Sequence, residues 1–85
     1  MRLFETSKFQ KLRKKLKDEE ERASLKSAVL QVLENPEAGK KLKGEFRDLR
    51  ALRFAVRGQA RRLVYKLDKD AVILFSFGPR QGIYK

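Results

Sequence analysis

Residues 49–78 read LRALRFAVRGQARRLVYKLDKDAVILFSFG, and this stretch decides the fold. Its beginning has a period of two, because Leu52, Phe54 and Val56 are large and apolar while the residues between them are cationic or small. Successive side chains of a strand point to opposite faces of a sheet, so this alternation predicts a strand with one buried face. We expect that strand to begin at Leu49.

Turn signals divide the rest of the stretch into two more strands. A Gly-Gln pair at 58–59 is the expected turn, residues 62–67 form the next strand, and 68–70 form the next turn. Residues 71–77 are almost continuously apolar, which suits a central strand covered on both faces. A Gly-Pro pair at 78–79 ends this strand. The three strands are expected to form an antiparallel sheet.

The N-terminal part has the pattern of a short strand at 2–5 followed by two helices. Thr6 or Ser7 can cap the first helix. Four acids at 18–21 suit the positive end of a second helix dipole, and the Asn-Pro pair at 35–36 ends that helix. Both helices have apolar stripes at helical spacing. The stripes consist of Phe9, Leu12 and Leu16, then Leu25, Ala28, Val29, Val32 and Leu33.

Residues 37–48 are polar and contain two glycines, which predicts a loop. The predicted order is therefore β-α-α-β-β-β. This is an α+β architecture, an antiparallel sheet with an N-terminal helical hairpin on one face. Eighty-five residues are expected to form one domain, 1–85.

Composition excludes several kinds of site. The chain has no cysteine and no histidine, which excludes a thiolate zinc site, a Ser-His-Asp triad and a Cys-His pair. Catalysis would depend on Lys, Arg, Tyr, Asp or Glu, with no metal and no cofactor expected. No apolar run approaches the roughly 20 residues of a membrane span, and the N-terminus lacks a signal peptide. We expect a cytoplasmic protein with no membrane partner.

The formal net charge is +11, and the charges are unevenly distributed. Residues 18–37 contain six acids, whereas residues 38–66 contain ten bases and two acids. Such a distribution predicts a positive face that binds a polyanion, above all RNA. The lysine-rich run at 11–17 is compatible with phosphate binding and equally with an ordinary solvated helix face.

Arginines are concentrated on the predicted sheet. Arg53 and Arg57 are expected on one strand face, with Arg62 on the neighbouring strand and Arg80 just after the third. A planar guanidinium can bind a phosphate through two parallel hydrogen bonds. Arg61 and Arg62 must point to opposite faces, so at most one of them belongs to this cluster.

Several segments resemble the RelE/ParE superfamily of toxins from toxin–antitoxin pairs. They are LRF at 52–54, RLVY at 62–65 and GPRQGIY at 78–84, supported by VLENP at 32–36 and KLKG at 41–44. The resemblance extends over essentially the whole chain and implies the same β-α-α-β-β-β order.

The resemblance also implies an activity, that of a RelE-like, ribosome-dependent endoribonuclease cleaving mRNA in the ribosomal A site. In that branch a ribose 2′-hydroxyl attacks the adjacent phosphate. The implied partners are an acidic antitoxin, the ribosome and mRNA. By position, Arg53 would contact phosphate, Arg62 would stabilise the transition state, Arg80 would donate a proton, and Tyr84 would orient the nucleotide.

The sequence departs from the family pattern at three positions. Ala55 stands where RelE-like toxins have a lysine usually assigned as general base, Pro79 replaces a histidine, and Arg61 replaces a tyrosine. The residues that can substitute for the missing base are Lys66, Arg57 and Lys85. The side chains expected to bind RNA are Arg53, Arg57, Arg61 and Lys66.

Two other functions fit the same sequence. A ParE-like inhibitor of DNA gyrase would use the fold without nuclease activity, and Ala55 favours this alternative. A basic nucleic-acid-binding module without toxicity is the third.

Overall fold

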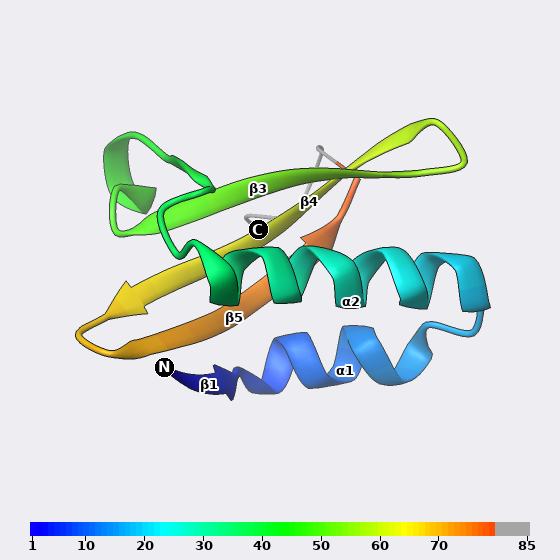
Figure 1. The fold of residues 1–85 in the computed structure, drawn as a ribbon, viewed down its shortest axis with the longest axis horizontal. Helices are drawn as coiled ribbons and strands as arrows, with labels where there is room; N and C mark the ends of the chain where they lie inside the picture. The colour runs from blue at the N-terminus through cyan, green and yellow to red at the C-terminus, as the bar shows by residue number, and fades with distance from the viewer. Residues whose placement is uncertain (80–85) are drawn as a thin grey trace.

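The computed structural model describes residues 1–79. Its elements are β1 (Arg2–Glu5), α1 (Ser7–Lys15), α2 (Glu19–Glu34), β2 (Lys40–Lys41), a short 3-10 helix (Gly44–Phe46), β3 (Leu49–Val56), β4 (Gln59–Asp68) and β5 (Ala71–Gly78). The two helices run in opposite directions, and α2 lies in front of β5 in the view of Figure 1. The predicted α+β class and the predicted order of its main elements are confirmed.

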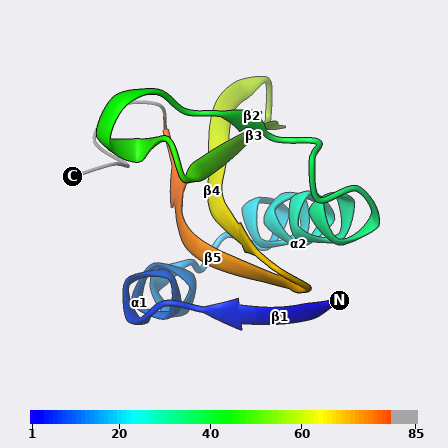
Figure 2. The ribbon, with the colours of Figure 1, turned by 90° about the vertical axis from the view of Figure 1, so that its left-hand side faces the viewer.

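The five strands form one sheet in the order β1-β5-β4-β3-β2. β3, β4 and β5 pair antiparallel, as predicted, but β1 pairs with β5 in parallel. Parallel neighbours need a long connection, and between β1 and β5 the chain passes through both helices and then through β2, β3 and β4. β5 therefore has a neighbour on each side, as expected for a central strand. Figure 2 shows the sheet as a curved layer, with β2 and β3 at one end and β1 at the other.

The prediction of a loop over residues 37–48 is wrong at β2. Lys40 stands opposite Ala51, and Lys41 opposite Arg50. The Leu42 N–H then donates to the Leu49 carbonyl at 3.0 Å. A two-residue edge strand is too short to show a period of two, which explains why the sequence pattern does not indicate it.

Side-chain caps start both helices. The Thr6 hydroxyl accepts from the Phe9 N–H at 3.1 Å and donates to the Phe75 carbonyl, so it also fastens the start of α1 to β5. Asp18 caps α2 by accepting from the Glu20 N–H at 3.3 Å. α2 ends before Asn35, as the Asn-Pro pair predicts.

One hydrophobic core joins both helices to one face of the sheet. Phe9 of α1 meets Phe77 of β5 edge to face, with ring centroids 5.3 Å apart. The buried members of this core are Phe9, Leu25, Ala28, Val32, Leu52, Leu63, Tyr65, Val72, Leu74 and Phe77. The helical stripes expected from the sequence supply its helix side.

The β3–β4 hairpin turns one residue earlier than predicted. Arg57 and Gly58 occupy the turn with φ of 52° and 78°, the left-handed conformation that a two-residue hairpin loop requires. β4 then begins at Gln59. Further along, Val64 pairs with Ser76 and Tyr65 with Leu74, so one extra residue of β5 bulges between them.

Candidate nucleic-acid interface

On the sheet face opposite the core, two arginines lie directly across from each other. Arg53 of β3 pairs in register with Arg62 of β4, whereas their neighbours Leu52 and Leu63 point into the core. Arg53 and Arg62 also line one cleft of about 290 Å³. The described residues that line this Arg53–Arg62 cleft are Lys40, Leu42, Ala51, Arg53 and Arg62, with no acid among them. Such a lining suits an anion that can bridge two guanidinium groups.

Lys66 lies on the same face but outside the cleft. It stands opposite Leu49, and it follows Arg62 by four residues, about 13 Å along an extended strand. A small apolar cluster of Ala51, Val64, Leu42, Leu49 and Phe75 occupies this part of the face. The structure therefore brings Arg53 and Arg62 together and leaves Lys66 beyond them.

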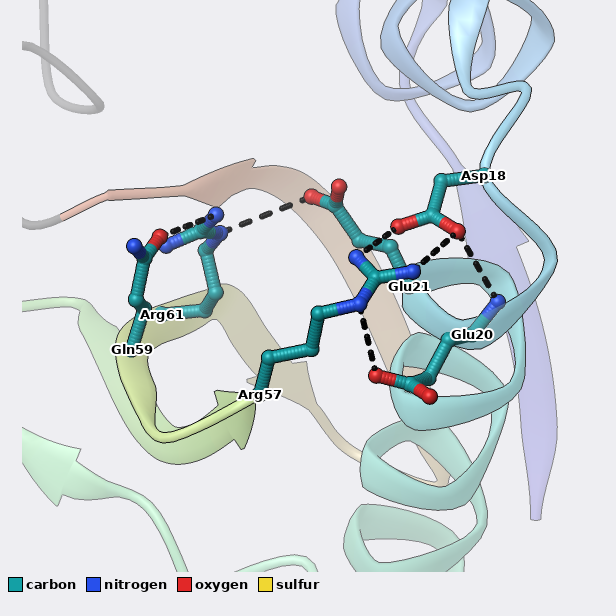
Figure 3. Close-up of polar contacts among 6 residues, drawn as sticks. All are labelled: Asp18, Glu20, Glu21, Arg57, Gln59 and Arg61. Atoms are coloured by element: carbon teal, nitrogen blue, oxygen red, sulfur yellow. Dashed lines mark hydrogen bonds and ion pairs between the residues drawn. The ribbon is translucent and has the colours of Figure 1, made fainter.

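The predicted shared face of Arg53 and Arg57 is wrong. β3 ends at Val56, and the left-handed turn residue Arg57 directs its side chain toward the start of α2 (Figure 3). Its guanidinium donates to both carboxylate oxygens of Asp18, one of them at 2.9 Å, and lies 3.1 Å from Glu20. Arg57 is thus held in an ion-pair cluster away from the cleft.

Arg61 lies on the core side of the sheet, opposite to Arg62, as the strand period predicts. Its Nε is 3.5 Å from a Glu21 carboxylate oxygen, and these two side chains are only 16% and 20% exposed (Figure 3). It also donates to the Ala60 carbonyl and to Gln59. We refer to Asp18, Glu20, Glu21, Arg57 and Arg61 as the α2–hairpin clasp.

The clasp changes the electrostatics of Asp18. Hydrogen bonds from Arg57 hold the pKa of Asp18 below its ordinary value, and the backbone N–H of Glu20 adds to this effect. The acids at the start of α2 therefore form ion pairs with the β3–β4 hairpin. These ion pairs neutralise Arg57 and Arg61, which the sequence pattern assigns to RNA binding.

A buried tyrosine fixes the loop that leads into β2. The Tyr65 hydroxyl donates to the Pro36 carbonyl at 2.7 Å and accepts from the Gly39 N–H at 2.8 Å. Burial raises the pKa of Tyr65, so the hydroxyl keeps its proton. Arg50 adds a hydrogen bond to the Gly39 carbonyl at 2.9 Å. A Cβ on Gly39 would lie 2.5 Å from the Tyr65 oxygen, which explains the glycine there.

A second hollow lies between the two helices. It measures about 580 Å³, and apolar side chains including Leu3, Phe9, Leu16 and Val29 line it. Among residues 1–79, four cations also contribute to its lining, Arg13, Lys14, Arg22 and Lys26, together with one acid, Glu5, which is ion-paired to Arg13 at 2.6 Å. We refer to it as the α1–α2 groove.

The basic run at 11–17 does not join the cleft. It belongs to α1 and the segment after it, and α1 packs against the opposite face of the sheet. Arg80, Tyr84 and Lys85 lie outside the described residues. Among residues 1–79, no helix is long and apolar enough to cross a membrane.

Lys40 lines the cleft although the sequence pattern does not indicate it. Its place beside Arg53 and Arg62 depends on β2, which brings it opposite Ala51. The only sequence signal is the KK pair next to the KLKG segment, and this pair does not indicate a strand.

Comparison with known proteins decides the family. The model of a family described as ParE-like toxins of type II bacterial toxin–antitoxin systems matches residues 3–85. The chain belongs to this family. As the resemblance implied, the toxin therefore belongs to a type II toxin–antitoxin system. No curated protein matches the toxin in sequence.

Solved structures place the toxin among RelE-like folds. It is similar to a chain of the intact Escherichia coli RelBE toxin–antitoxin complex, with 30% identity and a TM-score of 0.73, over 94% of this chain and 96% of that one. Isolated E. coli RelE is 31% identical with a TM-score of 0.72, over 98% and 89% of the two chains. The RelBE2 complex of Mycobacterium tuberculosis, at 22% identity, TM-score 0.67 and coverage of 93% and 96%, supports the fold alone.

Proposed function

We propose that this toxin is a ribosome-dependent endoribonuclease that cleaves mRNA in the ribosomal A site. The observation that supports the proposal most directly is the Arg53–Arg62 cleft, where two arginines stand opposite each other in the sheet and none of the lining residues among 1–79 is acidic. The similarity to E. coli RelE agrees with this activity.

In the proposed reaction, the ribose 2′-hydroxyl attacks the adjacent phosphorus and the bond to the 5′-oxygen breaks. The products are a 2′,3′-cyclic phosphate and a free 5′-hydroxyl. Arg62 stabilises the charge that develops on the phosphate, and Arg53 binds a phosphate oxygen. Guanidinium donors aimed at a developing charge are among the strongest contributions to catalysis. Arg80 would protonate the leaving oxygen and Tyr84 would orient the nucleotide, both on the family resemblance.

Proton transfer from the 2′-hydroxyl has fewer candidates than the sequence suggested. Arg57 is engaged in the α2–hairpin clasp, and Lys66 lies outside the cleft. A site without a strong base gains most from precise positioning of its substrate. We therefore expect cleavage to depend on the ribosome, which orders the mRNA.

We propose that an acidic antitoxin binds the α1–α2 groove. The 30% identical RelE-like structure comes from a toxin–antitoxin complex, and the apolar lining with its several cations fits an amphipathic acidic segment. Leu3 lines the groove and is 42% exposed, whereas Leu30 of α2 is 50% exposed outside it. Leu3→Glu should weaken copurification with the antitoxin, and Leu30→Glu should not. Equal retention of antitoxin by both variants would place the contact elsewhere.

The nuclease activity is tested in a purified translation system. Ribosomes programmed with a defined mRNA are mixed with the toxin, and the product ends are identified chemically. A new 5′-hydroxyl end inside the A-site codon, absent with Arg62→Ala, is the expected result. Intact mRNA together with inhibition of gyrase supercoiling would replace the proposal by the ParE-like alternative. Intact mRNA with active gyrase would favour a basic binding module.

A further inference from the structure

We propose that Lys40 is a third phosphate-binding residue of the RNA site, supplied by β2. This inference rests on the proposed function and adds to it a residue that the family resemblance does not assign. Lys40 stands opposite Ala51, and both line the cleft that Arg53 and Arg62 share. Residues directly opposite in an antiparallel pair point to the same face, so Lys40 is on the face of the two arginines.

The composition of β3 explains why a further cation is useful there. On its outer face, β3 has Leu49, Ala51, Arg53 and Ala55, so this strand supplies one cation. Lys40 places an ammonium group beside the first of the two alanines. An RNA backbone has one phosphate per nucleotide, and each phosphate neutralised on binding releases counterions.

The position of Lys40 is unusually well fixed for an edge strand of two residues. The residue before it, Gly39, is held by the Tyr65 hydroxyl at 2.8 Å and by Arg50 at 2.9 Å. After β2, the Leu42 N–H donates to the Leu49 carbonyl at 3.0 Å. These bonds on both sides of β2 hold the Lys40 backbone against β3, while the side chain itself is exposed.

Lys41 provides a matched control. It is the other residue of β2, is also exposed, and is outside the described lining of the cleft. Successive strand residues point to opposite faces, so Lys41 points away from Arg53 and Arg62. Lys40→Ala and Lys41→Ala thus remove the same charge from neighbouring positions. Lys40→Arg keeps the charge at the cleft.

The experiment measures binding of a short single-stranded RNA by fluorescence anisotropy over a range of salt concentrations. Lys40→Ala should weaken binding roughly fivefold, the upper range for an exposed ion pair. It should also lower the slope of log affinity against log salt by about 0.7, the value for one phosphate contact on a single strand. Lys40→Arg should retain the wild-type slope, and Lys41→Ala should change it much less. Thermal unfolding of each variant confirms that it is folded.

Failure of the Lys40 assignment can be distinguished from failure of the proposed function. If the wild type binds RNA with a steep salt slope but Lys40→Ala and Lys41→Ala behave alike, the assignment of Lys40 is wrong and the RNA site stands. If the wild type neither binds RNA nor cleaves mRNA on the ribosome, both the assignment and the proposed function are overturned.

Discussion

Tyr65 is completely buried, yet its hydroxyl reaches the loop before β2 and makes hydrogen bonds to both Pro36 and Gly39. The ring belongs to the core and the hydroxyl holds the loop that leads into β2, so one side chain couples stability to the placement of Lys40. A sequence pattern predicts the first role from the strand period. It cannot predict the second, because the partners are 26 and 29 residues away.

Tyr65→Phe tests this coupling. The substitution keeps the ring and leaves the Gly39 N–H and the Pro36 carbonyl without their partner. Leaving a buried polar group without its hydrogen bond lowers the free energy of unfolding by about 1–3 kcal/mol. We expect the free energy of unfolding in urea to fall by this amount at neutral pH. An unchanged free energy of unfolding would show that the hydroxyl does not hold the loop.

Arg62 and Arg61 are neighbours in sequence, but we expect their replacement by alanine to have different effects on the rate of cleavage. Removal of a donor aimed at a developing charge costs about 10²–10³ in rate. Arg62→Ala should therefore slow single-turnover cleavage on the ribosome by about this factor. Arg61→Ala removes the Glu21 ion pair on the other face and should retain most of the activity. Equal loss of rate in both variants would contradict the division of the two arginines between faces.

At the scale of elements, the strand period and the cap residues predicted most of the architecture. The alternation from Leu52 to Val56 identified β3, and the acids at 18–21 and the Asn-Pro pair at 35–36 indicated the limits of α2. The errors occur where tertiary contacts decide. The left-handed turn at Arg57 removes that residue from the strand face, and the pairing of β2 with β3 is too short to leave a pattern.

The α2–hairpin clasp connects two elements through charge, so its contribution should depend on pH. Asp18 has a pKa below its ordinary value in the folded protein because Arg57 stabilises the carboxylate. The contribution is therefore complete above about pH 3.9, the ordinary pKa of Asp, and is lost as pH falls through the lower folded pKa.

Asp18→Asn isolates this contribution, because asparagine is as good a helix N-cap as aspartate. The wild type should have a higher urea midpoint than the variant at about pH 7, and the difference should shrink as the pH falls below about 3.9, the ordinary pKa of Asp. A difference of constant size across that range would mean that the charge of Asp18 does not stabilise the fold.

At the scale of the whole molecule, the net charge of +11 is divided among surfaces with different roles. The acids at the start of α2 neutralise the hairpin arginines, the α1–α2 groove carries cations beside apolar side chains, and the cleft on the outer face collects Lys40, Arg53 and Arg62. The sequence pattern predicted a positive face, but it assigned to that face two arginines, Arg57 and Arg61, that form ion pairs elsewhere. Charge alone cannot distinguish an arginine that meets phosphate from one that meets a carboxylate.

We propose above that the Arg53–Arg62 cleft is the site at which this toxin cleaves mRNA during translation. The most direct test expresses the wild type and an Arg53→Ala/Arg62→Ala variant from a tightly controlled promoter and maps 5′-hydroxyl ends of mRNA across the transcriptome. Growth arrest with new ends inside translated codons is expected for the wild type, and neither effect is expected for the folded variant. Growth arrest by the wild type without new ends, or new ends that persist in the variant, would contradict it.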